Sequence, residues 1–371
     1  MAKIPIKPVL AGYTGEEYAD VFDKRAMPKP TTELKVGQLS EEDVRKFFED
    51  GYILVKDVFR KETLEACKAA INEMVEDLAQ SLYKAGKITD LCRNSGFPNR
   101  LIQLEKQFAG TSILFIKQAR LMRAFKDLWT DEVLLNIIEQ LIGPDIAGHP
   151  VWNLRAKIPR DEATTVPWHQ DSGYLDTNSY RVLQPTAWIP FVDTTESNGC
   201  LQIMKGGHKS GKVATHQCCH GGTWYVMLEE EEMEKTLGID VMTDLRTCPV
   251  PLGSMLLFNN LIPHRSLNNV SDHIRWSVDL RWQNPHHPYG YYDLKEGVVF
   301  RTKDNPNPVV DWDKFEGVDR FQITADAVKD KPQDEKDAEF DTSIQGPWMK
   351  KWEIVHMNQH VLKMQSEEKS A

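Results

Sequence analysis

The sequence predicts a mainly β fold with α-helices, built as a β sandwich or barrel with helical additions at both ends. Two observations carry this prediction. Residues 151–283 contain short runs rich in Val, Ile, Trp and Thr, separated by Gly, Pro, Asn and Asp, a pattern typical of such folds. Residues 41–50, 61–87 and 102–145 instead show apolar side chains at helical spacing. A chain of 371 residues is long enough for one large domain of this kind.

The first expected elements follow local signals. Ser40 is a suitable N-cap for a short helix over residues 41–50, which Gly51 would end. Residues 52–55 are apolar and include β-branched side chains, so we expect a strand. Residues 61–87 follow with one apolar stripe and predict a long amphipathic helix.

The strand-rich part has five clear runs. They are residues 151–159, 186–193, 200–205, 254–260 and 275–282. Residues 301–345 are rich in Pro and Asp and predict a surface loop, whereas residues 348–364 predict a final helix.

These elements give a domain organisation. Residues 1–38 would form an irregular arm and residues 39–371 a single catalytic domain. Within that domain we expect a mostly helical support (39–150), a β core (151–283) and a C-terminal loop and helix (284–371).

Composition restricts the partners. The formal net charge of −10 argues against a nucleic-acid-binding surface. No apolar run reaches the length of a membrane span, and the first residues lack the apolar core of a signal peptide. Six cysteines without a CxxC pair favour a reduced, cytoplasmic compartment. We therefore expect a small-molecule partner and no nucleic acid or membrane; the oligomeric state stays open.

One set of side chains predicts a metal site. His169 and Asp171 are two residues apart and would point to the same side of a strand. A single His-x-Asp also fits a strand-end histidine hydrogen-bonded to a neighbouring carboxylate. However, His264 follows the apolar run 254–258 and can complete a set of two imidazoles and one carboxylate, which suits Fe(II) and leaves three coordination positions open. Arg275, on the next apolar run, could hold a dicarboxylate co-substrate.

Further motifs extend this pattern along residues 50–282. They are residues 50–55 (DGYILV), 168–171 (WHQD), 186–188 (TAW), 198–201 (NGCL), 207–209 (GHK), 253–254 (GS) and 262–264 (IPH), followed by Arg275. In this order they resemble the phytanoyl-CoA dioxygenase family of Fe(II)- and 2-oxoglutarate-dependent oxygenases. The resemblance covers about two thirds of the chain and is specific to the family, not to a substrate.

The resemblance implies a double-stranded β-helix, the jelly-roll or cupin-like core, with helices packed outside it. The implied iron ligands are His169, Asp171 and His264. Arg275 would bind the distal carboxylate of 2-oxoglutarate, Ser266 would support the same carboxylate, and Trp188 would line the co-substrate pocket. The family reaction converts 2-oxoglutarate and O2 to succinate and CO2 while a substrate is oxidised. Because halogenating relatives lack the carboxylate ligand, Asp171 favours hydroxylation or a related oxidation.

Alternatives stay open within and outside this class. An acyl-CoA hydroxylase resembling phytanoyl-CoA hydroxylase is one, although a peroxisomal signal and a basic landing surface are not evident. A non-catalytic binding module of the same fold is another, and the intact set of ligands argues against it. A zinc hydrolase would have no need of Arg275.

Strand alternation also suggests substrate-binding residues. Asp279 and Arg281 lie on the same side as Arg275, and Asn153 and Lys157 would share one side of an earlier strand. The first pair could bind a polar or zwitterionic molecule, or form a structural ion pair. The second pair could face an acidic ligand, or solvent at a sheet edge.

Overall fold

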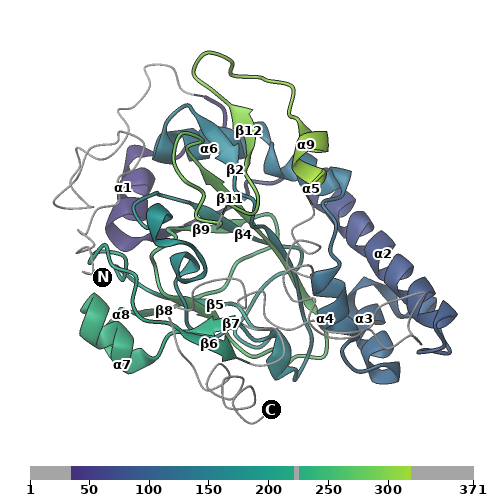
Figure 1. Cartoon of the computed structure of the whole chain (residues 1–371). Helices are drawn as coiled ribbons and strands as arrows, with labels where there is room; N and C mark the ends of the chain where they lie inside the picture. The colour runs from purple at the N-terminus through teal and green to yellow at the C-terminus, as the bar shows by residue number, and fades with distance from the viewer. Residues whose placement is uncertain (1–34, 221–224, 292, 319–371) are drawn as a thin grey trace, which may run out of the picture.

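The computed structural model describes residues 35–220, 225–291 and 293–318 (Figure 1). Most of the expected arm and the expected final helix lie outside these residues. Where the chain is described, no helix combines the length and the apolar character that crossing a membrane requires.

Six helices precede most of the sheet. They are α1 (Glu41–Asp50), α2 (Lys61–Lys84), α3 (Gly96–Gln107), α4 (Thr111–Lys117), α5 (Arg123–Trp129) and α6 (Glu132–Ile142). The predicted start of α1 is confirmed, since Ser40 Oγ accepts a hydrogen bond from the Asp43 amide at 3.1 Å. Gly51 ends the helix at φ 84°, a conformation that glycine adopts without steric cost. The pattern over 102–145 is divided among four helices, with one break at Gly110 (φ 96°) and another where Asp131 caps α6.

The strands form a large sheet, a small sheet and a separate pair, and every pairing is antiparallel. The large sheet has the order β1 (Tyr52–Val55), β9 (Met255–Phe258), β4 (Thr186–Pro190), β11 (Arg275–Gln283), β2 (Ile146–Gly148) and β12 (Val298–Arg301), with β3 (Asn153–Lys157) also paired to β11. The small sheet has the order β10 (His264–Ser266), β5 (Leu201–Met204) and β8 (Leu245–Cys248). The pair is β6 (Gln217–His220) with β7 (Tyr225–Met227). The five runs named from the sequence contain β3, β4, β5, β9 and β11. They do not include six strands of three or four residues, which are β2, β6, β7, β8, β10 and β12.

The two sheets face each other across a small apolar cluster. Trp188 and Phe258 from the large sheet pack there with Leu201, Ile203 and Cys248 from the small one. The architecture is therefore sheet-rich with helices outside, and within the described ranges its strands do not close into a barrel. The space beside this cluster, between the layers, is where polar side chains gather.

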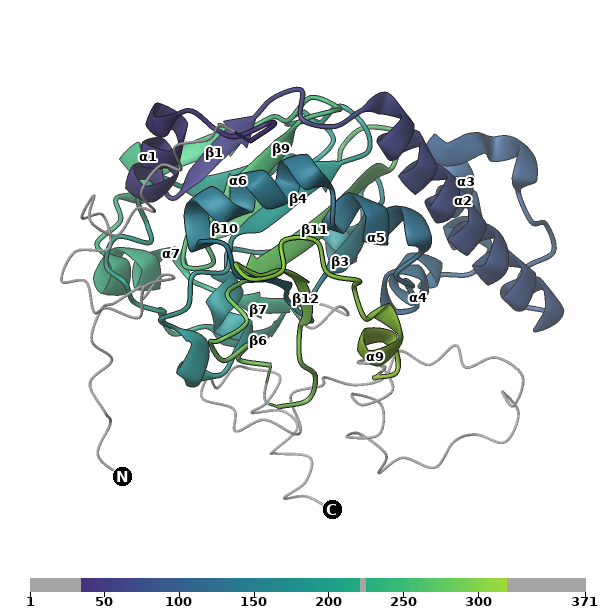
Figure 2. The same ribbon diagram turned by 90° about the horizontal axis from the view of Figure 1, so that it is seen from above.

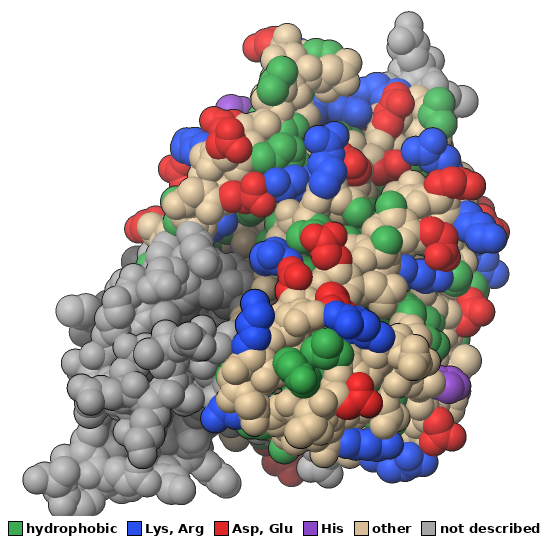
Figure 3. Space-filling view, turned by 90° about the vertical axis from the view of Figure 1, so that its right-hand side faces the viewer, with side chains coloured by type: hydrophobic (Ala, Val, Ile, Leu, Met, Phe, Trp, Pro, Cys, Tyr) green, Lys and Arg blue, Asp and Glu red, His purple; other side chains and the backbone are tan. Residues whose placement is uncertain are grey.

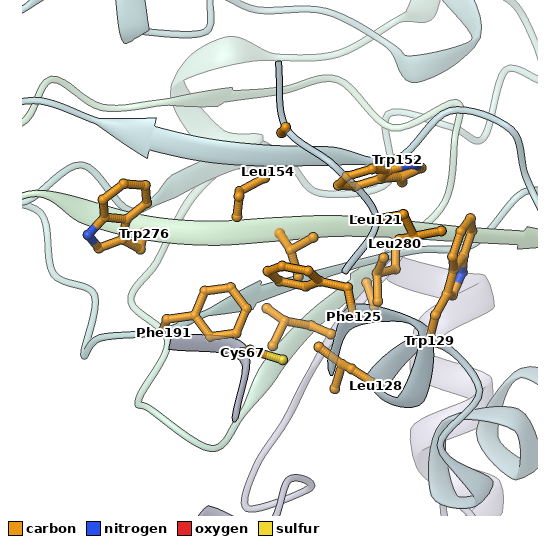
Figure 4. Close-up of a cluster of buried hydrophobic side chains, with 14 of the residues drawn as sticks. Cys67, Leu121, Phe125, Leu128, Trp129, Trp152, Leu154, Phe191, Trp276 and Leu280 are labelled. Atoms are coloured by element: carbon orange, nitrogen blue, oxygen red, sulfur yellow. The ribbon is translucent and has the colours of Figure 1, made fainter. Parts of the chain in front are cut away.

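Strand β11 separates the outer core from this inner space. Its even-numbered side chains, such as Trp276 and Leu280, are buried among helix residues that include Cys67 and Phe125 (Figure 4). Figure 2 shows α5 and α6 on this outer side. The odd-numbered residues of β11 consequently point inward. They are Arg275, Ser277, Asp279, Arg281 and Gln283.

The expected loop over 301–345 is partly wrong. Helix α9 (Trp312–Glu316) lies inside that range, and Phe315 is buried with its ring centroid 6.0 Å from that of Trp129. A single turn has too few residues to show a helical period, so the sequence pattern did not reveal it. Residues from 319 onward lie outside the described part.

The outer surface agrees with the charge balance. On the side where α2, α3 and α4 lie, acidic and basic side chains alternate and neither sign forms a broad patch (Figure 3). Two short helices, α7 (Glu230–Glu232) and α8 (Val241–Asp244), lie near the small sheet on another side (Figure 1).

Candidate metal and co-substrate site

The three candidate metal ligands come together from two segments. His169 pairs with His264 of β10 in an antiparallel bridge, with backbone hydrogen bonds of 3.0 and 2.9 Å. Asp171 does not continue a strand as predicted; it begins a short 3-10 helix, Asp171–Tyr174. The expected common side still results, because Gln170 between them is extended (φ −102°, ψ 136°). The side chain of Gln170 points away from the ligands, and its Nε2 donates to the carbonyls of Lys212 (2.9 Å) and Leu261 (2.6 Å).

The geometry of the set fits a metal ion. One ligand atom from each residue lies within 4.8 Å of the others, and all three side chains are buried. Asp171 Oδ1 is 3.6 Å from His169 Nε2 and 4.0 Å from His264 Nε2. Each Nδ1 faces a carbonyl that can only accept, Pro167 O at 2.9 Å and Ile262 O at 3.1 Å. Each Nε2 is therefore left as the unprotonated ligand nitrogen.

The charges of the set also suit a cation. Burial, together with the neighbouring His169, lowers the pKa of His264 to about 3, so this imidazole is neutral at pH 7. Burial alone would raise the pKa of Asp171, but the Arg281 guanidinium and both histidines hold it well below its usual range. Two neutral imidazoles and one carboxylate are the donor set of a facial triad for Fe(II).

A small pocket, partly open to solvent, adjoins the two histidines. Arg275 projects into it from β11 and is 2% exposed. Its guanidinium carbon lies 5.0 Å from the Trp188 ring centroid, and Nη1 donates to Ser277 Oγ at 2.5 Å. Its buried Nε has no hydrogen-bond partner among the described residues. Burial lowers the pKa of Arg275 to about 10, which still leaves it charged at neutral pH.

A second buried cation lies behind this pocket. Lys157 of β3 is paired in register with Arg275 and is 1% exposed. Its Nζ donates to Ser266 Oγ (2.9 Å), Thr165 Oγ1 (3.0 Å) and the Thr164 carbonyl (3.2 Å). These acceptors are uncharged, and within the described ranges no carboxylate forms an ion pair with Lys157 or Arg275. Burial, and then Arg275, lowers the pKa of Lys157 well below its usual value.

The candidate substrate residues divide into two groups. Asp279 lines the pocket, where its Oδ2 accepts from Arg155 Nε at 2.9 Å. Arg281 and Asn153 do not line it: Arg281 binds Asp171, and with its amide oriented to satisfy its hydrogen bonds, Asn153 accepts from Arg281 Nη1 at 3.2 Å. Lys157 likewise lies behind Ser266 and not on the pocket wall.

Two residues of the site were missed by the sequence reasoning. Thr186 donates to Asp171 Oδ2 at 2.9 Å, and Tyr225 lines the pocket with its hydroxyl 3.2 Å from Arg155 Nη1. Thr186 lies within the TAW motif, and its register partner is Arg281. The position of Thr186 beside Asp171 depends on this pairing of β4 with β11, which the sequence pattern does not show. No pattern in the sequence singles out Tyr225.

Two histidines and an aspartate arranged as a facial metal triad lie beside a pocket with two buried cations, Arg275 and Lys157, that form no ion pair with a carboxylate among the described residues. This arrangement defines the class: an iron- and 2-oxoglutarate-dependent oxidoreductase. The chain belongs to the phytanoyl-CoA dioxygenase family, whose model matches residues 47–277.

Named relatives share most of this region. The chain is similar to the 1-deoxypentalenic acid 11-beta-hydroxylase of Streptomyces arenae, at 26% identity over 64% of this chain and 79% of that protein. It is also similar to the phytanoyl-CoA dioxygenase domain-containing protein 1 of Danio rerio, at 24% identity over 63% of this chain and 86% of that protein. Among solved structures, the non-heme monooxygenase ThoJ is 17% identical, with a TM-score of 0.48, and the match covers 71% of this chain and 85% of that one.

Proposed function

We propose that the chain is an Fe(II)- and 2-oxoglutarate-dependent dioxygenase that hydroxylates, or otherwise oxidises, a small molecule. For hydroxylation, one substrate C–H, one O2 and one 2-oxoglutarate give one C–OH, one succinate and one CO2. The proposal includes a double-stranded β-helix core within a single catalytic domain, residues 39–371. The two facing antiparallel sheets and the shared core of helices and strands support this fold.

The observation that carries the proposal is the buried charge of Arg275 in the pocket, which forms no ion pair within the described part of the chain. Burying an unpaired cation costs several kcal/mol, so such a group is retained where a ligand supplies the counter-charge. The guanidinium can bind a carboxylate through two donors, and its unpaired Nε is available for this purpose. Lys157, which bonds Ser266, adds positive potential behind the same end of the pocket.

Different residues would bind the metal and position the co-substrate. His169, Asp171 and His264 would hold the iron. Trp188 packs over the Arg275 guanidinium and keeps it at the end of the pocket. When bound, iron and 2-oxoglutarate supply the activation of O2 and the oxidising equivalents that the side chains lack.

The pocket also limits the substrate. Apolar side chains such as Ile116, Val166 and Phe258 line it together with the Arg155–Asp279 ion pair. A small molecule with an apolar body and one polar group matches these walls. Asp279 is thus a candidate to face the substrate, whereas Asn153, Lys157 and Arg281 would act through other residues.

The test is anaerobic addition of Fe(II) and then 2-oxoglutarate, monitored by visible absorption. We expect the weak charge-transfer band of the iron–2-oxoglutarate chelate in the native chain and no band in Asp171→Ala. Asp272→Ala is the matched control, because that aspartate is 82% exposed and does not line the pocket. A native chain that binds iron but shows no band would overturn the proposal and favour a binding module or a hydrolase.

A further inference from the structure

Arg281 is a charged residue in direct contact with Asp171, one of the three candidate metal ligands. The proposed reaction gives Arg281 no direct role. We propose that Arg281 is a positioning residue: together with Thr186 it presents one oxygen of Asp171 to the metal and withholds the other. The inference rests on the proposed function only in requiring a metal at His169, Asp171 and His264.

The contact between Arg281 and Asp171 is a two-point fork. Arg281 Nε donates to Asp171 Oδ2 at 3.0 Å, and Nη2 donates to Oδ1 at 2.8 Å. The two side chains are 7% and 6% exposed. Such a planar pairing fixes the orientation of the carboxylate and not only its charge. The next acidic oxygen, Asp279 Oδ2, is 4.0 Å from Nη2, and that carboxylate is held by Arg155.

The two oxygens of Asp171 are left with different capacities. A carboxylate oxygen can accept about two hydrogen bonds. Oδ2 already has two donors, Arg281 Nε and Thr186 Oγ1. Among the described residues Oδ1 accepts a hydrogen bond only from Arg281 Nη2, and it is the oxygen that faces both histidine Nε2 atoms. Oδ1 is therefore the oxygen that would be free to bind a metal ion.

The number of oxygens that Asp171 contributes decides how many coordination positions stay open. With one oxygen from Asp171, the three residues would fill three positions of an octahedral ion and would leave three, enough for a chelating 2-oxo acid and O2. A carboxylate free to bind through both oxygens would fill a fourth position. Arg281 and Thr186 thus keep a position available that the reaction needs.

The fork is itself held rigidly. The Arg281 carbonyl accepts from Trp129 Nε1 (3.2 Å) and from the His149 amide (3.0 Å). Its Nη1 donates to the Val151 carbonyl at 3.3 Å, and Asn153 contacts the same nitrogen. Because the main chain and the guanidinium of Arg281 are both held by hydrogen bonds and the side chain does not line the pocket, we infer that it acts on Asp171 and not on the substrate.

Cobalt(II) alone, added to the full chain after chelator treatment, is the probe. Its visible spectrum reports coordination number, and its titration reports affinity without any turnover. We expect Arg281→Gln to weaken cobalt binding about 10- to 100-fold, the range for residues that orient a metal ligand. We also expect its spectrum to change. Arg281→Lys, which keeps the charge but loses the fork, should change the spectrum with a smaller loss of affinity.

Thr186→Val tests the same idea without removing a buried charge. It frees one acceptor site on Oδ2 and should shift the spectrum in the same direction as Arg281→Gln. It also keeps the inference testable where Arg281→Gln fails to fold. Arg160→Gln, at a 70% exposed arginine, is the control.

Turnover gives a second readout. We expect the Arg281 and Thr186 variants to lower kcat and release more succinate per oxidised product, with the 2-oxoglutarate KM changed less than threefold. Native affinity and an unchanged cobalt spectrum in Thr186→Val and in the folded Arg281 variants would overturn the inference. A native chain that binds no cobalt would instead overturn the proposed function, so the two failures are distinct.

Discussion

Arg275 and Lys157 lie opposite each other in register on β11 and β3, and both are buried without a carboxylate partner among the described residues. Two adjacent cations in a low-dielectric interior repel each other, and this repulsion contributes to the lowered pKa of Lys157. An anion bound at this end of the pocket would offset both the cost of burying the two charges and their mutual repulsion. The pairing therefore links the stability of the ligand-free chain to the binding of its co-substrate.

Arg275→Gln should raise the KM for 2-oxoglutarate at least about 30-fold, because loss of a buried charge-assisted contact costs about 2 kcal/mol or more. Metal binding should stay close to native, since Arg275 makes no contact with the three ligands. Steady-state kinetics with varied 2-oxoglutarate, alongside a cobalt titration, measure both quantities. Arg160→Gln should behave as the native chain does. An unchanged KM in Arg275→Gln would remove this residue from the co-substrate site.

His169→Ala and Asp171→Ala should each lose iron-dependent turnover by a factor of about 1,000 or more, because neither leaves a complete facial set. Succinate release at saturating iron is the measurement. His273→Ala, at an exposed loop histidine outside the pocket lining, is the control. Turnover near the native rate in either ligand variant would show that the metal lies elsewhere.

Part of this site was predictable from the sequence, and part was not. The alternation along residues 275–282 predicted which side chains share a face, and the structure places the even positions in the core and the odd positions inward. The partner of each inward residue was not predictable, because it depends on which strands pair. Arg281 faces Asp171 only because β11 lies beside β4 and the chain turns into a 3-10 helix at Asp171.

The free energy of unfolding should fall on acidification, because the buried His208 resists protonation in the folded chain. This imidazole is fully buried with Nε2 2.9 Å from the Phe48 carbonyl, and burial lowers its pKa from 6.5 to about 3. Between these values the unfolded chain binds a proton that the folded chain does not, so stability is full above pH 6.5 and declines as pH falls. At pH 5.5 the loss is about 1.4 kcal/mol relative to pH 8.

His208→Gln removes this titration. Its metal-free unfolding free energy, measured by denaturant at pH 8 and pH 5.5, should depend on pH less than that of the native chain, by about 1.4 kcal/mol. The metal-free form is used because the ligand histidines titrate against bound metal. Exposed His273→Gln should leave the native pH dependence in place. Equal pH dependence of native and His208→Gln chains would mean that His208 is protonated alike in both states.

Lys157→Met separates stability from binding. Methionine fills a similar volume without an ammonium, so the substitution relieves the cost of a buried charge and its repulsion by Arg275. We expect the ligand-free chain to gain about 1 kcal/mol or more in unfolding free energy. The affinity for 2-oxoglutarate, measured anaerobically with metal bound, should meanwhile fall about tenfold, because the pocket end loses positive potential and Ser266 loses one of its two donors, keeping the Val166 amide. Lys303→Met, at an exposed lysine, should change neither quantity. A variant that is less stable and binds 2-oxoglutarate as tightly as before would show that Lys157 is a structural hydrogen-bond donor. Higher stability combined with weaker binding of 2-oxoglutarate is instead the result expected for a cation that is retained to bind an anionic ligand.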